Sequence, residues 1–160
     1  MTVKIGFGYD SHRFKEGDYI VVGGEKIAFD RALVAHSDGD VLLHALCDAL
    51  LGAAALGDIG KHFPDNDPKY KDIDSSALVK NVVQELAKSN YLVGNVDSTI
   101  ILERPKLAEH IDKMQQNVSR LLEISIDDIN IKATTNEGMG FIGRGEGVAA
   151  YVVVTLLKKL

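Results

Sequence analysis

The chain has 160 residues, of which 46% are hydrophobic and 26% are charged. Both values are near the averages of globular domains, so they exclude disordered and collagen-like classes. Lys and Arg number 18 and Asp and Glu number 23, which gives a formal net charge of −5. A mildly acidic domain is a poor candidate for a general nucleic-acid-binding protein.

Cysteine content and apolar runs bear on the compartment. A single cysteine, Cys47, allows no intrachain disulfide and favours a reducing compartment. The longest apolar run, Val148 to Leu157, is about half of the roughly 20 residues that a membrane-spanning helix needs. The first residues, MTVKIGFGYD, have neither a signal-peptide nor a transit-peptide pattern. We therefore expect a cytoplasmic protein with no membrane segment, folded as one domain over residues 1–160.

Periodicity along the chain predicts strands interleaved with helices. The expected strands are 5–9, 19–22, 26–29, 95–103, 129–134 and 148–157. The expected helices are 41–56, 75–89 and 107–122. Gly23-Gly24 predicts a hairpin, Ser37 or Asp38 is expected to cap the first helix, and residues 58–71 are expected to be irregular. The pattern favours an α/β (α+β) fold in which three helices cover a mixed four-stranded sheet, with a small hairpin beside it.

A metal site is the first candidate for chemistry. Asp10 and His12 are two apart in an expected strand, so their side chains point the same way. His44 lies early in the first helix and is a candidate third ligand. Two His and one carboxylate form a catalytic zinc set with one open position. Asp48, one turn beyond His44, is a candidate partner for its second ring nitrogen; the competing interpretation is an ordinary satisfied polar pair.

Three further segments could bind an anion. His36 to Asp40 enters the first helix, where free N–H groups favour anions, although a plain helix cap explains it too. Thr134 to Glu137 ends a strand and offers hydroxyls and a carboxylate for phosphate and Mg²⁺, or a simple turn. Residues 138–147 are glycine-rich and hold Phe141 and Arg144, and Arg144 is a candidate phosphate ligand or a lone surface arginine.

Taken together, these segments resemble the 2-C-methyl-D-erythritol 2,4-cyclodiphosphate synthase family. The matching stretches, in chain order, are GFGYDSHRF (6–14), AHSDGDVLLHALCDALLGAAALGDIGKHFPDNDP (35–68), GNVDSTII (94–101) and KATTNEGMGFIGRGEG (132–147). The resemblance implies a lyase of the non-mevalonate (MEP) isoprenoid pathway. Its substrate, 4-diphosphocytidyl-2-C-methyl-D-erythritol 2-phosphate, cyclises as its 2-phosphate attacks the β-phosphorus and CMP leaves.

The resemblance also implies roles for particular residues. It implies Zn²⁺ ligands at Asp10, His12 and His44, and Mg²⁺ or Mn²⁺ at Glu137. It implies that His36 and Thr135 steady the transition state. The implied substrate contacts are Asp10, His12, His36, Ser37, Asp58, Ile59, Gly60, Phe63, Pro64, Asp65, Asn66, Asp67, Leu102, Glu103, Arg104, Pro105, Lys106, Leu107, Ala108, Thr134, Thr135, Asn136, Glu137, Phe141 and Arg144. The stretch Leu102 to Ala108 corresponds to the cytidine pocket, in which the pair Glu103-Arg104 is a variable-looking detail that bears on nucleotide selectivity.

The family forms homotrimers with active sites between neighbouring subunits. The zinc side comes from one subunit and the cytidine side from the next. Some members hold an isoprenoid diphosphate in an axial cavity, at positions that correspond to Phe141 and Arg144. Two alternatives to the cyclase remain: a zinc phosphohydrolase on the same scaffold, and a non-catalytic trimer that binds isoprenoid diphosphates.

Overall fold

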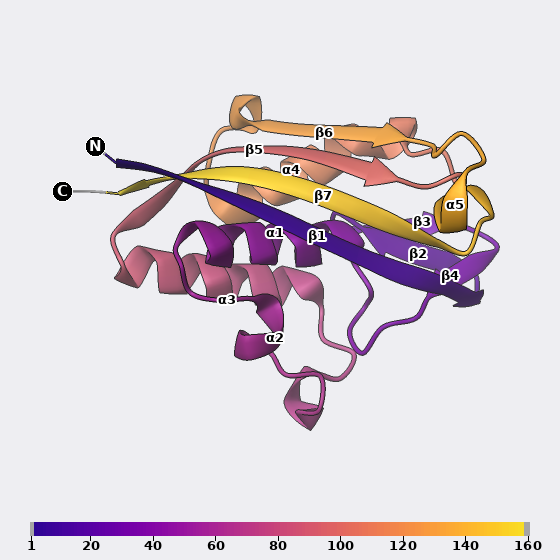
Figure 1. Cartoon of the computed structure of the whole chain (residues 1–160), viewed down its shortest axis with the longest axis horizontal. Helices are drawn as coiled ribbons and strands as arrows, with labels where there is room; N and C mark the ends of the chain where they lie inside the picture. Colours follow the sequence, from indigo (N-terminus) through magenta and orange to yellow (C-terminus); the bar gives the residue numbers. More distant parts are fainter. Residues whose placement is uncertain (1, 159–160) are drawn as a thin grey trace.

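The main element of the computed structural model, which describes residues 2–158, is a five-stranded mixed sheet (Figure 1). The strand order is β4-β1-β7-β5-β6. The strands are β1 (Thr2–Glu16), β4 (Arg31–Leu33), β5 (Tyr91–Ile101), β6 (Ile129–Thr134) and β7 (Gly147–Lys158). Neighbours are antiparallel except β5 and β6, which are parallel. The α+β class with a mixed sheet is confirmed.

The predicted count of four strands in this sheet was wrong. The fifth strand, β4, has only three residues and pairs antiparallel with the end of β1, where Phe14 faces Leu33. Three residues are too few to show an alternating pattern. The separate hairpin is as predicted, with β2 (Tyr19–Val22) and β3 (Glu25–Ala28) joined through Gly23-Gly24, both at positive φ.

Three long helices, α1 (Val41–Ala53), α3 (Ser75–Lys88) and α4 (Ile111–Leu122), lie on one face of the sheet (Figure 1). The first helix ends three residues earlier than expected, because the chain turns there and Ala55 has a left-handed φ of 58°. Its cap is Asp40, not Ser37 or Asp38. The third helix starts at Ile111, after a 3₁₀ turn, η2 (Ala108–His110).

Short helices occupy segments for which no helix was predicted, including residues 58–71, which were expected to be irregular. Residues 58–71 form α2 (Ile59–His62) and the 3₁₀ helix η1 (Pro68–Tyr70). The glycine-rich segment contains α5 (Gly140–Gly143), and another 3₁₀ helix, η3 (Ile126–Asp128), precedes β6. Among residues 2–158, no helix is both long enough and apolar enough to cross a membrane.

Two glycines let α1 lie directly on β1. A Cβ at Gly6 would be 1.9 Å from the Ala49 carbonyl oxygen, and one at Gly8 would be 1.9 Å from the Ala45 carbonyl oxygen. No side chain fits between the two backbones there. Most residues of α1 are therefore buried, and the helix forms the centre of the hydrophobic core.

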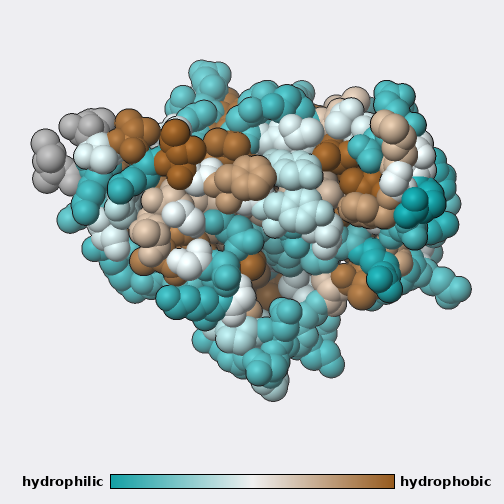
Figure 2. Space-filling view, viewed as in Figure 1, coloured by the Kyte–Doolittle hydropathy of each residue, from teal (hydrophilic) through white to brown (hydrophobic). Residues whose placement is uncertain are grey.

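The opposite face of the sheet carries exposed apolar side chains. Odd-numbered residues of β1 point to this face, and Phe7 stacks on Tyr151 of β7 at a ring distance of 6.0 Å. Figure 2 shows this face, with apolar residues gathered over β1 and β7. The exposed large apolar residues of these two strands are Val3, Ile5, Phe7, Tyr9, Tyr151 and Val153.

Candidate active site

Asp10, His12 and His44 converge where β1 meets α1. The Oδ2 atom of Asp10 lies 2.7 Å from His12 Nε2 and 3.1 Å from His44 Nδ1. The two ring nitrogens are 3.1 Å apart. The strand alternation predicted from sequence turns Asp10 and His12 to the helix side, and the close approach of α1 at Gly8 brings His44 to them.

These three donor atoms lie close enough together to share one tetrahedral metal ion. Zinc bonds of ~2.0–2.2 Å in tetrahedral geometry put neighbouring donors about 3.3–3.6 Å apart. The two observed separations of 3.1 Å are a few tenths of an ångström shorter, and the Asp10–His12 separation of 2.7 Å is shorter by more than half an ångström, so a bound ion would spread that pair slightly. Within residues 2–158, this is the one group of three or more His, Cys, Asp and Glu side chains close enough to share an ion. Three ligands leave a fourth position open to a substrate atom.

The Asp10 carboxylate and His44 shift each other's pKa values toward their charged forms. Burial alone would raise the pKa of Asp10, but hydrogen bonds and charge from His12 and His44 outweigh it and lower that pKa to about 2. Burial alone would lower the pKa of His44, but the Asp10 carboxylate reverses this and raises that pKa above its ordinary value. Asp10 is therefore ionised, as a metal ligand must be, and a proton on His44 competes with a metal.

The second ring nitrogen of His44 does not contact Asp48. Its Nε2 atom lies 2.9 Å from Ser75 Oγ and 3.0 Å from Ser37 Oγ. Asp48 instead accepts the Ile59 N–H at 2.7 Å and so anchors the start of α2. The predicted role of Asp48 was wrong because its carboxylate binds the first residue of α2. That helix lies in a segment that was expected to be irregular. Ser75 was missed because it is separated from His44 by 31 residues.

Asp40 fixes the start of α1, and thereby the position of His44 one turn further along the helix. Its Oδ1 atom accepts the N–H groups of Leu43, at 3.0 Å, and Gly23, at 2.9 Å. Its Oδ2 atom accepts the Gly24 N–H at 2.7 Å. The fully buried Asp40 side chain thus ties the helix that carries His44 to the β2–β3 hairpin.

The metal group opens into a cavity of about 340 Å³. From the predicted site, Ile59, Gly60, Phe63 and Asp65 line it together with the ligands and the His36-Ser37 pair. Lining residues that sequence reasoning missed are Val34, Ala35, Tyr70, Ile73 and Leu78.

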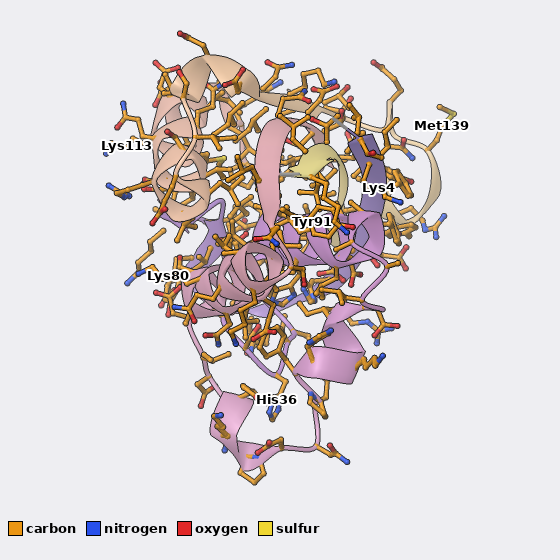
Figure 3. The ribbon with its side chains drawn as sticks, turned by 90° about the vertical axis from the view of Figure 1, so that its left-hand side faces the viewer. Lys4, His36, Lys80, Tyr91, Lys113 and Met139 are labelled. Carbon is orange, nitrogen blue, oxygen red and sulfur yellow. The ribbon has the colours of Figure 1, made fainter. Side chains whose placement is uncertain are left out.

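The His36 side chain brings an unpaired polar atom to this cavity. Figure 3 shows His36 near the segment that contains α2 and η1. Its Nε2 atom is buried and has no hydrogen-bond partner among residues 2–158. A buried polar atom without a partner is costly, so it marks a place where a polar ligand group is expected.

Four predicted contacts from the same loop are not part of the cavity lining. Asp58 caps α2 by accepting the Lys61 N–H at 2.9 Å, and Asp67 caps η1 by accepting the Lys69 N–H at 2.9 Å. Pro64 and Asn66 lie beside these turns and do not line it either. The caps give both aspartates a structural role in shaping the loop.

A second cavity, of about 440 Å³, gathers the predicted nucleotide segment. It shares no lining residue with the metal cavity. Its lining from the predicted site is Leu102, Glu103, Pro105, Lys106, Leu107, Ala108, Thr134 and Thr135, and Ala133 and Ile111 complete it. Leu102 and Leu107 are themselves almost fully buried and belong to the hydrophobic core.

Neighbours of this cavity have other partners. Glu103 accepts the Asn136 N–H at 2.8 Å, which links the two strand ends. Arg104 points away, over the Phe29 ring, and pairs with Asp30 at 3.4 Å. Glu137 is exposed at a left-handed φ of 52°, and its N–H donates to Thr135 Oγ1 at 3.2 Å.

Phe141 and Arg144 line a third cavity, of about 670 Å³. Arg13 and Arg31 line the same cavity, so it is rich in cationic side chains. Arg144 is paired with Glu146 at 2.8 Å.

The chain that carries this fold and this three-residue group belongs to the YgbB family, whose model matches residues 3–157. A protein of Methylococcus capsulatus named 2-C-methyl-D-erythritol 2,4-cyclodiphosphate synthase is 60% identical over 156 residues, 98% of this chain and 99% of that protein.

Solved structures agree with this membership. The IspF of Plasmodium falciparum in a CDP complex is 32% identical, with a TM-score of 0.86, and the match covers 99% of this chain and 97% of that one. The bifunctional IspDF from Campylobacter jejuni is 41% identical, with a TM-score of 0.93. That match covers 97% of this chain but only 42% of the longer one.

Proposed function

We propose that this chain converts 4-diphosphocytidyl-2-C-methyl-D-erythritol 2-phosphate to 2-C-methyl-D-erythritol 2,4-cyclodiphosphate and CMP. This would make it a lyase of the non-mevalonate (MEP) pathway. The proposal draws on the cyclodiphosphate synthases that it is similar to over almost the whole chain. The observation that carries it is the three-ligand group of Asp10, His12 and His44, open to a cavity beside His36.

The donor set suits Zn²⁺, because two imidazoles and one carboxylate at tetrahedral spacing are typical zinc ligands. Bound there, zinc would polarise a phosphate oxygen and neutralise charge. The attacking phosphate is already anionic, so the protein needs no strong general base and acts mainly by positioning. His36 is proposed to donate from its unpaired Nε2 to a phosphate oxygen, and Ser37, Ile59 and Gly60 to hold the erythritol phosphate.

The rest of the substrate is assigned to the second cavity. Thr134 and Thr135 are proposed to contact the diphosphate, and Thr135 to steady the transition state. Lys106 and the backbone around it are proposed to bind cytidine, in keeping with relatives solved with CDP. The exposed carboxylate of Glu137 is the proposed ligand of Mg²⁺ or Mn²⁺, supported by the oxygen preference of these ions and by its place beside the threonines. Asn136 lies between these residues as a further contact.

The remaining loop contacts carried over by resemblance are Asp58, Phe63, Pro64, Asp65, Asn66 and Asp67. Of these, Phe63 and Asp65 have the best support, because both line the metal cavity. Asp58, Pro64, Asn66 and Asp67 are proposed to influence substrate binding indirectly, by fixing the conformation of the loop.

A homotrimer with active sites between subunits is the proposed assembly. The proposal is supported by the separation of the metal cavity and the second cavity, which share no lining residue within one chain, so that each could meet the complementary cavity of a neighbouring copy. The exposed apolar face of β1 and β7 supplies a surface for such contacts. In the cavity on the three-fold axis of this proposed trimer, Phe141 and Arg144 are proposed to bind an isoprenoid diphosphate. The cationic lining of the cavity supports this assignment.

Two broader expectations remain proposals. Residues 1–160 are proposed to act as one catalytic domain, in keeping with one contiguous core over the described part of the chain. The cytoplasm is the proposed compartment, supported by the single buried cysteine.

Subunit mixing tests the proposed composite site. Asp10→Ala removes the metal side and Lys106→Glu reverses charge on the nucleotide side, so each pure variant should release little CMP. When the two chains are co-expressed, a random trimer holds an intact site at about one in four interfaces, because each site takes one side from each neighbour. Recovery of about a quarter of the CMP release supports the assembly. No recovery in mixed trimers contradicts it.

A further inference from the structure

Hydroxyl groups behind His44 form a chain that ends on a carboxylate. Ser75 is fully buried at the first position of α3, and its Oγ atom lies 2.9 Å from His44 Nε2. Asp38 lies on the other side of Ser75, in the loop before α1. The Oγ to Oδ1 distance between Ser75 and Asp38 is 2.5 Å.

The partners of Asp38 determine the direction of these hydrogen bonds. Its Oδ1 atom also accepts the Asp40 N–H at 3.0 Å, and its Oδ2 atom accepts the Ser75 N–H at 2.9 Å. Three donors around one carboxyl group fit a carboxylate that only accepts. Because a hydroxyl has a single proton, Ser75 donates it to Asp38, and the Ser75 oxygen is left as an acceptor toward His44.

We propose that Asp38 and Ser75 are positioning residues that hold His44 with its proton on Nε2, so that Nδ1 faces Asp10 and His12 as a free ligand atom. This inference rests on the proposed function, because it assumes that the three residues bind a metal. The partner of a ligating histidine's second nitrogen fixes its tautomer and ring orientation. The carboxylate in this case acts through a buried hydroxyl.

If His44 carries its proton on Nε2, the Ser37 hydroxyl does not need to donate its own proton to His44. Its oxygen accepts the Gly39 N–H at 3.3 Å and lies 3.0 Å from the protonated Nε2 of His44. The Ser37 hydroxyl proton is then available to the cavity that Ser37 lines, where a phosphate oxygen is the expected acceptor. One chain of hydrogen bonds thus connects the metal ligand to the substrate loop.

Three variants test the proposal. Ser75→Ala removes the acceptor that Asp38 orients and leaves His44 Nε2 with Ser37 alone. Asp38→Asn keeps the size of the side chain, but its amide can donate to Ser75, which frees the hydroxyl proton for His44 and favours the wrong tautomer. Ser76→Ala is the matched control, since Ser76 is next along the helix and its side chain has no part in the chain of hydrogen bonds.

The readouts are the zinc dissociation constant, by competition with a chelator, and the His44 tautomer, by ¹⁵N NMR at alkaline pH without metal. Both test variants should weaken zinc binding about 10- to 100-fold, whereas Ser76→Ala should leave it unchanged. The unaltered chain should carry its proton on Nε2, and Asp38→Asn should shift it toward Nδ1.

A proton on Nδ1 in the unaltered chain overturns the proposal without any variant, so a folding defect cannot hide the answer. Zinc affinity within about twofold of the unaltered chain in both test variants overturns it too, since partners of metal ligands normally matter more than that. If the unaltered chain binds zinc in the expected tautomer but makes no cyclic product, the proposed function fails and this inference stands.

Discussion

Gly8 of β1 lies so close to Ala45 of α1 that a Cβ at Gly8 would be 1.9 Å from the Ala45 carbonyl oxygen. The obstacle is backbone, which a rotamer change cannot move. His44 is the residue before Ala45, and Asp10 follows Gly8 by two positions. The contact between Gly8 and Ala45 therefore sets the distance between the two halves of the metal site.

Gly8→Ala should force α1 away from β1. We expect a loss of unfolding free energy of about 1–3 kcal/mol, as for other overpacked cores, and weaker zinc binding. Urea denaturation and zinc titration measure the two effects. Gly52→Ala is the control, because Gly52 lies in α1 with nothing within 4 Å of an added Cβ. It should stabilise the chain by up to about 1 kcal/mol. Unchanged zinc affinity in Gly8→Ala would contradict the positioning role of this contact.

Zinc binding should depend on pH through His44. Asp10 raises the pKa of His44, so zinc must displace a proton, and its affinity should rise with pH past the ordinary value of 6.5. The contribution of His44 to the folding stability of the metal-free chain changes with pH in the opposite direction. A raised pKa in the folded state stabilises the chain below pH 6.5, and this is lost as pH rises through the folded-state pKa.

The difference in melting temperature with and without zinc should therefore widen from about pH 6 to pH 8, as the linkage of proton and metal requires. Thermal scans at fixed zinc measure it. The lowered pKa of Asp10, about 2, keeps that carboxylate ionised throughout this window. If the difference in melting temperature with and without zinc stays constant across this pH range, His44 releases no proton when metal binds.

Asp48 should act on substrate rather than on metal. Its carboxylate holds the Ile59 N–H at the start of α2, and Ile59 lines the metal cavity. Asp48→Ala should raise KM roughly tenfold, in line with losing one charged hydrogen bond of about 1.5 kcal/mol. Zinc affinity should be unchanged, and Asp48→Asn should restore most of the loss because its carbonyl still accepts. Weakened zinc binding with normal KM would instead assign Asp48 to the metal.

The apolar face of β1 should hold the assembly together. Phe7 is 61% exposed and stacks on Tyr151. Phe7→Asp should turn a trimer into monomers in sedimentation experiments and abolish CMP release, while the metal group of each chain still binds zinc. Ile126→Asp, on η3 outside this face, is the control and should remain trimeric. A trimeric, active Phe7→Asp would place the interface elsewhere.

The convergence of Asp10, His12 and His44 could be predicted from the sequence because both signals are local. Alternation in β1 turns Asp10 and His12 to one side, and the Leu- and Ala-rich run places His44 in a helix. The hydrogen-bond partners of these three side chains could not be predicted in the same way. Ser75 is 31 residues from His44, and its contact depends on how α3 packs against α1. The strand β4 was missed for a related reason, since it exists only through pairing with β1.

The most direct test is ³¹P NMR of the purified protein with the diphosphocytidyl substrate, zinc and magnesium. If the chain is a cyclodiphosphate synthase, the spectrum will show CMP together with two coupled phosphorus signals of a cyclic diphosphate, and Asp10→Ala will lose both. CMP with an open-chain phosphate would show a hydrolase. No turnover by a zinc-loaded trimer would contradict an enzymatic role and favour a protein that only binds diphosphates.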